Sequence, residues 1–228
     1  MVVVTLPCIN RSTEDYELGD PGKFEIASFH TMPRIAYAAV HVVADPVENN
    51  NPSIDAAIDW EATINYRRYV WSLGLGVAEA MDTAQRGMGV NWENSLELVK
   101  RSVDAAREFQ IENGGALLAC GAGTDHLELS PNISVDDVIN AYVEQCHAIE
   151  SAGGRIILMA SRALAMAASS PDDYLKVYER ILSQIKEPVI IHWLGEMFDP
   201  ALKGYWGSDD HWTGMETCLK VIAGKAEK

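Results

Sequence analysis

Basic residues are scarce in this sequence. Its 228 residues include 18 Lys and Arg against 33 Asp and Glu, which gives a formal net charge of −15 and a pI near 4.7. A surface that binds nucleic acid needs a basic stripe that displaces counterions from the phosphates. We therefore expect no nucleic-acid partner.

The sequence also lacks cysteine motifs of the kind that bind metal ions, and it lacks long apolar runs. The four cysteines (Cys8, Cys120, Cys146 and Cys218) show neither CxxC nor zinc-ligand spacing, which suits free thiols in a reducing compartment. No apolar run approaches the ~20 residues needed to cross a bilayer, and no basic segment precedes the short apolar stretch Val2–Leu6. The sequence predicts a cytoplasmic protein without a membrane partner.

Hydrophobic residues make up 48% of the chain and recur in five short runs, roughly forty residues apart. Each run is rich in β-forming residues, ends in polar or ionisable side chains and precedes a helical pattern. The runs are Arg34–Asp45, Leu73–Asp82, Gly115–Gly123, Arg155–Ala163 and Pro188–Glu196. Such alternation predicts a parallel sheet covered by helices, with the chemistry at the carboxyl ends of the strands.

Helix start signals follow the runs. Small polar residues that cap free backbone amides, in one case followed by a proline, precede each helical pattern. These predicted N-caps are Asp59, Asn91, Ser134 and Ser170, and the last helix is expected to begin near Asp210–Thr213. Two glycine pairs, Gly114-Gly115 and Gly153-Gly154, stand where a helix should end in a left-handed cap.

The first thirty residues differ from the rest. Val2–Leu6 and Phe24–Phe29 read as two strands joined through a loop that contains Asp20-Pro21-Gly22. We therefore predict a hairpin extension over residues 1–30 and a second unit, the main fold, over residues 31–228.

Five strand–helix units fit either an open doubly wound sheet or most of an eight-stranded barrel. The open sheet usually carries a glycine-rich phosphate loop after its first strand, whereas Ala44–Asn51 is acidic and has no glycine. Gly121-Ala122-Gly123 lacks the third glycine of such a loop. We predict an α/β fold of the (β/α)8 barrel type that is incomplete, because eight units typically need ~250 residues.

Ionisable residues interrupt two of the apolar runs. Tyr37, His41 and Asp45 would share one face of the first strand, although a core histidine and a turn aspartate explain the last two equally well. Glu79 stands in an otherwise apolar strand, where a carboxylate is costly unless it is paired, bound to metal or protonated. We interpret Glu79 as a functional residue.

The loops after the later runs are dense in polar groups. Residues of this kind that could bind or transform a ligand are Asp82, Thr83, Gln85, Arg86, Gly121, Thr124, Asp125, His126, Arg162, His192 and Glu196. His192 is a strong candidate because it lies within an apolar run, whereas Arg162 could hold a carboxylate or form a salt bridge at the rim. Cys120 has no histidine at nucleophile spacing and reads as a structural thiol.

Three segments carry a resemblance to a known family. Ala36–Pro46 (AYAAVHVVADP), Val77–Gly89 (VAEAMDTAQRGMG) and Leu118–Leu127 (LACGAGTDHL) resemble a family of uncharacterised bacterial proteins, domain of unknown function 993. That family is grouped with dihydrodipicolinate synthase and N-acetylneuraminate lyase. The resemblance implies a (β/α)8 barrel in which a lysine of the sixth strand forms a Schiff base with a 2-keto acid.

The resemblance also places functional residues. The loop that binds the substrate carboxylate in those aldolases falls at Met81–Gln85, where Asp82 and Thr83 take the threonine positions. The proton-shuttling tyrosine of the fifth strand falls at His192, and the glycine-rich end of the third strand resembles Gly121–Thr124. The Schiff-base lysine is expected beyond Lys228.

Three hypotheses follow. The first is an aldolase or lyase without a cofactor that acts on a small, keto-acid-like carbonyl compound. Its catalytic residues would be His192, Asp82 and Glu79, and its substrate-binding residues Thr83, Gln85, Arg86, Gly121, Thr124 and Arg162.

The second hypothesis is a barrel enzyme that depends on a divalent metal. Its candidate ligands, besides the catalytic residues above, are His41, Asp45, Asp125, His126 and Glu196. The third is a truncated barrel that is not catalytic. Because the edges of an incomplete barrel invite pairing, we expect a homo-oligomer.

Overall fold

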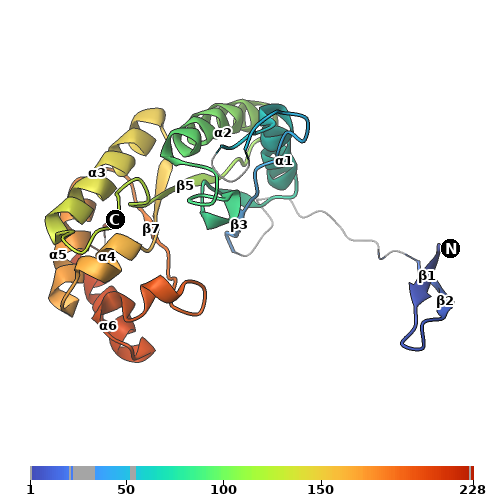
Figure 1. Cartoon of the computed structure of the whole chain (residues 1–228). Coiled ribbons are helices and arrows are strands. Elements are labelled where there is room, and N and C mark those ends of the chain that lie inside the picture. Colours follow the sequence, from blue (N-terminus) through green and yellow to red (C-terminus); the bar gives the residue numbers. More distant parts are fainter. Residues whose placement is uncertain (1, 21, 23–33, 52–54, 226) are drawn as a thin grey trace.

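A five-stranded parallel sheet forms the centre of the molecule. The computed structural model describes residues 2–20, 22, 34–51, 55–225 and 227–228. The strands lie side by side in chain order and are β3 (Tyr37–Ala39), β4 (Gly76–Glu79), β5 (Leu118–Ala122), β6 (Arg155–Leu158) and β7 (Ile190–Ile191). The sheet curls into part of a barrel, so the predicted incomplete α/β barrel is confirmed at this level (Figure 1).

Helices connect the strands and cover the outside of the sheet. They are α1 (Trp60–Ser72), α2 (Trp92–Asn113), α3 (Val135–Ala152), α4 (Arg162–Ala167), α5 (Pro171–Leu182) and α6 (His211–Gly224). Among the described residues, three short segments form 3₁₀ helices, namely η2 (Asp82–Ala84), η3 (Pro200–Leu202) and η4 (Tyr205–Gly207).

The predicted helix starts are confirmed, and so is the left-handed cap at Gly153, whereas Gly114, the C-cap of α2, has φ 71° and ψ 155° and does not adopt that conformation. The side chains of Asp59, Asn91, Ser134 and Asp210 each accept a backbone N–H of the first helical turn. Ser170 forms a reciprocal capping box with Asp173. The C-cap of α3, Gly153, has the left-handed backbone (φ 88°, ψ 18°) that glycine adopts at low cost.

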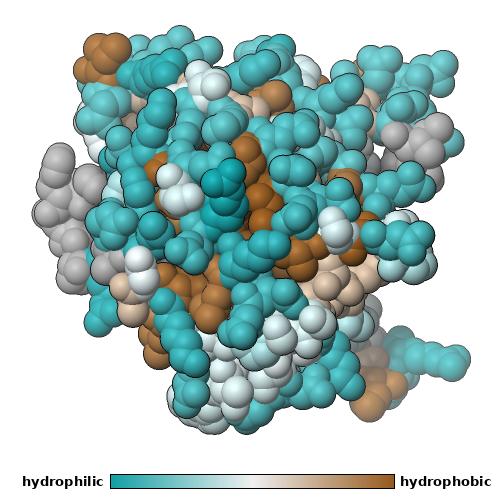
Figure 2. All heavy atoms as spheres, turned by 90° about the vertical axis from the view of Figure 1, so that its left-hand side faces the viewer, coloured by the Kyte–Doolittle hydropathy of each residue, from teal (hydrophilic) through white to brown (hydrophobic). Residues whose placement is uncertain are grey.

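Alternate residues of the strands face opposite sides. Ala78, Ala119 and Ile157 point to the inner face, where Met81 and Met159 pack on them. On the other face, Cys120, Ala122, Ile156 and Leu158 pack against α2, α3, α5 and α6 in the main core, and Val77 joins a second cluster with Val70, Trp71 and Phe109. The outer surface over α3 and α5 is mostly hydrophilic, with narrow hydrophobic patches between polar side chains (Figure 2). Within the described ranges, no helix combines the length and apolar character needed to span a membrane.

The strands are shorter than the apolar runs that predicted them. Pairing of β3 stops at Ala39, so the prediction that His41 and Asp45 share a strand face with Tyr37 is wrong. The backbone of Asp45 pairs with Ala57 instead, and its carboxylate accepts the backbone N–H of Val47 in a turn. Asp45 is therefore the turn residue of the alternative interpretation.

The amino-terminal hairpin has a different second strand from the one predicted. β1 (Val3–Pro7) pairs antiparallel with β2 (Thr13–Glu17). The sequence did not signal β2 because all its residues are exposed, so it lacks the alternation of a half-buried strand. The predicted second strand, Phe24–Phe29, and the turn at Pro21 lie outside the described residues.

Candidate functional site

A cavity of about 670 Å³ lies at the carboxyl ends of the strands. Its lining comes from the ends of β3 and β4, from the loop after β5 and from the segments that follow β6 and β7. Seven of the predicted site residues line it: Asp82, Thr83, Arg86, Thr124, Asp125, Arg162 and His192. This is the edge of the sheet where the sequence predicted the chemistry.

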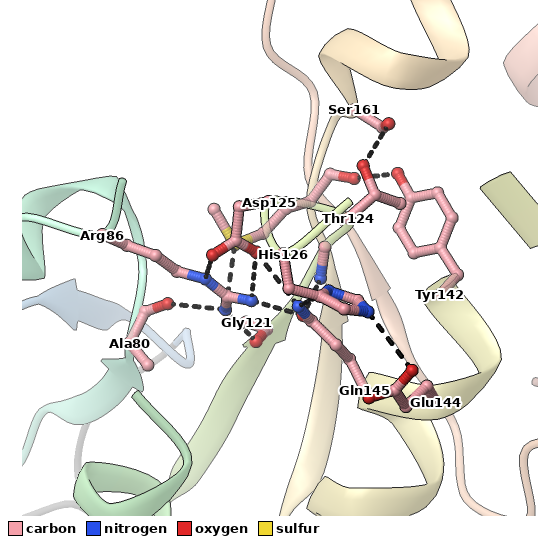
Figure 3. Close-up of polar contacts among 12 residues, drawn as sticks. Ala80, Arg86, Gly121, Thr124, Asp125, His126, Tyr142, Glu144, Gln145 and Ser161 are labelled. Carbon is pink, nitrogen blue, oxygen red and sulfur yellow. Dashed lines mark hydrogen bonds and ion pairs between the residues drawn. The ribbon is translucent and has the colours of Figure 1, made fainter. Parts of the chain in front are cut away.

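Arg86 uses all five of its N–H donors within the protein (Figure 3). Its Nε and one Nη2 hydrogen bind Asp125 at 3.0 and 2.6 Å, and the other Nη2 hydrogen binds the amide oxygen of Gln145. Nη1 donates to the carbonyl oxygens of Gly121 at 2.6 Å and Ala80 at 3.2 Å. Ala80 has a left-handed backbone (φ 53°), which is unusual for alanine. Arg86 thus joins β4 to β5 and has no donor left for a ligand.

Asp125 is the charge partner of Arg86. Its side chain is 28% exposed, whereas that of Arg86 is 1% exposed. Burial raises the pKa of Asp125, but the hydrogen bonds and charge of Arg86, together with the hydrogen bond from Gln145, outweigh burial and lower it below its ordinary value. Asp125 therefore stays ionised and balances the arginine.

Gln145 is the hub of this network, and the sequence prediction missed it. It lies fully buried on α3. Its amide oxygen accepts the backbone N–H of Gly123 at 2.7 Å as well as the Arg86 bond, and its Nε2 lies 3.1 Å from Asp125 and 2.7 Å from Nδ1 of His126 (Figure 3). The helical period places Gln145 on the same helix face as Tyr142 and Ile149, which are both fully buried. A polar residue on this face was the sequence signal that could have pointed to Gln145.

Two hydroxyl groups meet in the cavity lining. Thr124 Oγ1 and Ser161 Oγ lie 2.6 Å apart, and the Ser161 oxygen also accepts the backbone N–H of Leu164. The backbone N–H of Ser161 donates to the phenol of Tyr205, which lies 3.1 Å from that of Tyr178. Burial raises the pKa of both phenols, so they remain neutral donors. Ser161 was not among the predicted residues.

His192 follows β7 directly, and its backbone N–H extends the ladder to Leu158 at 2.9 Å. In the described part of the chain, its buried Nδ1 has no hydrogen-bond partner. Burial lowers the pKa of His192, and the negative charge of Asp82 opposes this shift. The ring is thus a neutral imidazole at neutral pH, and His192 is one of the residues that line the cavity.

Asp82 and Thr83 begin η2 and face the cavity, while Arg162 lies at its rim. The carboxylate of Asp82 forms no hydrogen bond or ion pair with any residue that the structure describes. Arg162 is 58% exposed and binds Asp199 at 2.5 Å. The alternative prediction for Arg162, a salt bridge at the rim, is therefore confirmed.

Glu79 does not line the cavity. It points to the helices on the outer face, where Arg67 of α1 binds both of its oxygens at 2.9 and 2.8 Å and Ser102 of α2 donates at 2.5 Å. Both side chains of the ion pair are 0% exposed. The prediction that this buried carboxylate needs a partner is confirmed, and the partner is Arg67. The pair is structural and lies outside the cavity.

Six other predicted residues also lie outside the cavity lining. They are Gln85, Gly121, His41, Asp45, His126 and Glu196. Gly121 packs too tightly for a ligand, because an added Cβ would lie 2.6 Å from the sulfur of Met159. Nowhere in residues 2–20, 22, 34–51, 55–225 and 227–228 do three His, Cys, Asp or Glu side chains come together to hold a metal ion. The described residues therefore offer no preformed set of metal ligands. The hypothesis of a divalent-metal enzyme stays a prediction.

Comparison with curated proteins finds no match for the chain. The model of one protein family, described as protein of unknown function (DUF993), matches residues 4–228. Because this match spans nearly the whole chain, the resemblance seen in the three sequence segments is confirmed. The chain belongs to the DUF993 family.

Proposed function

We propose that the cavity binds a small carbonyl compound and that His192 transfers protons in an aldolase or lyase reaction. The observation that carries this proposal is that His192 lines the cavity as a neutral ring whose Nδ1 has no hydrogen-bond partner among the described residues. A general base must be unprotonated and lie within reach of the substrate. His192 also stands where the resemblance places the proton-shuttling residue of the fifth strand.

The neighbouring groups suit a carbonyl substrate. The Thr124 and Ser161 hydroxyls can donate to or accept from substrate oxygens, and Asp82 can hold a substrate hydroxyl. The buried phenols behind Ser161 and the Arg86 network fix the wall on which these groups stand. The cavity volume lies within the ~300–1,000 Å³ typical of small-molecule sites.

The proton path of a retro-aldol cleavage is simple in this geometry. His192 takes the proton of the hydroxyl group on the far side of the breaking C–C bond, and that hydroxyl carbon becomes the carbonyl carbon of the first product. The electron pair of the C–C bond moves towards the substrate carbonyl and forms an enolate. The imidazolium then returns the proton to the enolate carbon, which completes the second product.

Exchange of α-protons in D₂O, followed by NMR, tests the proposal across a whole class of compounds at once. A panel of small ketoses, aldoses and keto acids is incubated with the wild type, with His192→Gln and with His147→Gln. His147 is an exposed control on α3, outside the cavity lining. We expect exchange by the wild type and by His147→Gln, and a loss of about 10²–10⁴-fold in His192→Gln. Full activity of His192→Gln, or no exchange with any panel member, contradicts the proposal.

Treatment with borohydride, which traps a Schiff base, distinguishes the Schiff-base route from the divalent-metal route. A Schiff-base route needs a lysine amine, and none of the described residues that line the cavity is a lysine. A trapped adduct between the protein and an active panel compound indicates such an amine elsewhere in the protein. Exchange that resists borohydride but is lost on chelation supports the divalent-metal alternative instead.

A further inference from the structure

We infer that the cavity selects neutral, polyhydroxylated carbonyl compounds over keto acids, and that Asp82 is the residue responsible. This inference rests on the function proposed above and names its substrate class. It starts from the charges that line the cavity and from which of them are already paired.

A substrate carboxylate finds no free cation among the described residues in the interior of the cavity. Arg86 is buried there, but each of its five donors is taken by Asp125, Gln145 or a backbone carbonyl. Arg162 lies at the rim, 58% exposed and bound to Asp199. Each arginine is therefore paired with an aspartate that also lines the cavity, and the bond that Arg162 makes uses its Nε alone.

Asp82 is the carboxylate that remains unpaired. No described residue donates a hydrogen bond to its side chain or forms an ion pair with it. It lies near enough to His192 for its charge to act on the pKa of that ring. Because a carboxylate only accepts hydrogen bonds, it attracts hydroxyl groups and repels a second carboxylate in the same cavity.

The rest of the lining favours a neutral compound as well. The Thr124 and Ser161 hydroxyls, 2.6 Å apart, carry no charge and can act as donors or acceptors. Trp193 lines the cavity with an indole ring that stacks on Trp206, with ring centroids 5.9 Å apart and an interplanar angle of 11°. A fixed aromatic wall beside a few polar groups is typical of small-molecule sites and offers an apolar surface to C–H groups.

Direct binding tests the inference independently of catalysis. The probes are erythrulose and fructose as neutral ketoses, pyruvate and 2-oxoglutarate as keto acids, and glucosamine as a cationic polyol. Dissociation constants are measured by calorimetry or ligand-observed NMR for the wild type, for Asp82→Asn and for Glu128→Gln. Glu128 is an exposed control carboxylate outside the cavity lining.

We expect the wild type and Glu128→Gln to bind a ketose at least about tenfold more tightly than either keto acid. In Asp82→Asn, which keeps the shape and removes the charge, this preference should fall about tenfold or invert. A wild type that prefers keto acids or glucosamine, binds no ketose, or keeps its preference in Asp82→Asn overturns the inference.

The two proposals can fail separately. Ketose binding that depends on Asp82 but is not accompanied by α-proton exchange contradicts the proposed reaction and supports the substrate class. Exchange on keto acids that depends on His192 supports the reaction and overturns the substrate class.

Discussion

The side-chain amide of Gln145 lies 2.7 Å from Nδ1 of His126 and fixes the tautomer of that ring. The amide oxygen must face Arg86 and the backbone N–H of Gly123, since both are donors. Nε2 of Gln145 therefore faces the histidine and can only donate. His126 accepts at Nδ1 and carries its proton on Nε2, which lies 3.4 Å from Glu144.

We therefore predict the Nε2–H tautomer for neutral His126. Nitrogen-15 NMR of the imidazole rings distinguishes the two tautomers directly. Replacement Gln145→Met removes the donor and should let the other tautomer appear. Observation of Nδ1–H in the wild type would contradict the assigned orientation of the Gln145 amide.

Arg86→Lys should destabilise the fold by about 2–4 kcal/mol, because lysine keeps the charge but cannot replace five fixed donors. Urea denaturation gives the free energy of unfolding. The control is Arg101→Lys, since Arg101 is 45% exposed and pairs with Glu97 on the helix surface. That change should cost less than about 0.5 kcal/mol. Equal effects of the two substitutions would show that the network is not structural.

The buried pair of Arg67 and Glu79 predicts strong non-additivity. Glu79→Gln leaves Arg67 as an uncompensated buried charge and should cost about 3–5 kcal/mol. The double variant Arg67→Met with Glu79→Gln should cost clearly less than the sum of the two single changes. Glu108→Gln, in an exposed pair with Arg68, is the control. Additive single effects at Arg67 and Glu79 would contradict the pairing.

The pH dependence of His192 has a definite sign. Burial lowers its pKa in the folded state below the ordinary 6.5, so the unfolded chain binds the proton more readily. The stability contribution of the neutral ring is complete above pH 6.5 and is lost as the pH falls from 6.5 through the lower folded pKa. Asp82→Asn should lower this pKa further, because the Asp82 charge opposes the burial effect.

Proton NMR of the ring gives the titration midpoint of His192 directly. We expect it below 6.5 in the wild type and lower again in Asp82→Asn. A control titration of Glu128→Gln should match the wild type. A midpoint above 6.5, or one that rises in Asp82→Asn, would be inconsistent with this site.

Thiol reactivity should separate Cys8 from the other cysteines. Burial raises the pKa of Cys146 to about 12 and also raises the pKa of Cys120 and Cys218, whereas Cys8 is only partly buried. With Ellman's reagent at pH 8, the native protein should show one fast thiol, which Cys8→Ser removes. The denatured wild type should show all four. A fast thiol that persists in Cys8→Ser would refute the burial of the other three.

Local signals in the sequence predicted α1, α2, α3, α5 and α6, but not α4, which begins inside the apolar run Arg155–Ala163. Asp59, Asn91 and Ser134 cap their helices as predicted, because a cap depends on a hydrogen bond to a residue a few positions away. Strand lengths depend on a partner that is distant in sequence. The run Arg34–Asp45 is apolar well beyond Ala39, yet pairing ends there.

The site shows the same division between local and distant information. His192 and Asp82 stand at strand ends and were found from their position along the chain. Gln145 comes from the middle of a helix. The helical period places it on the buried face, but its bond to Arg86, 59 residues away, follows from no local pattern. Glu79 was expected at the site because its strand was recognised, but the side of the strand that it faces depends on Arg67.

The order of the strands has a consequence for folding. Every strand of the main sheet except the two at its edges, β3 and β7, pairs with the strand before it and the strand after it in the chain, so each new pairing closes a loop between consecutive strands. Short loop closures cost little chain entropy and favour rapid folding. During synthesis each unit meets a template that has already emerged from the ribosome, and β3 to β7 can assemble in the order in which they are translated.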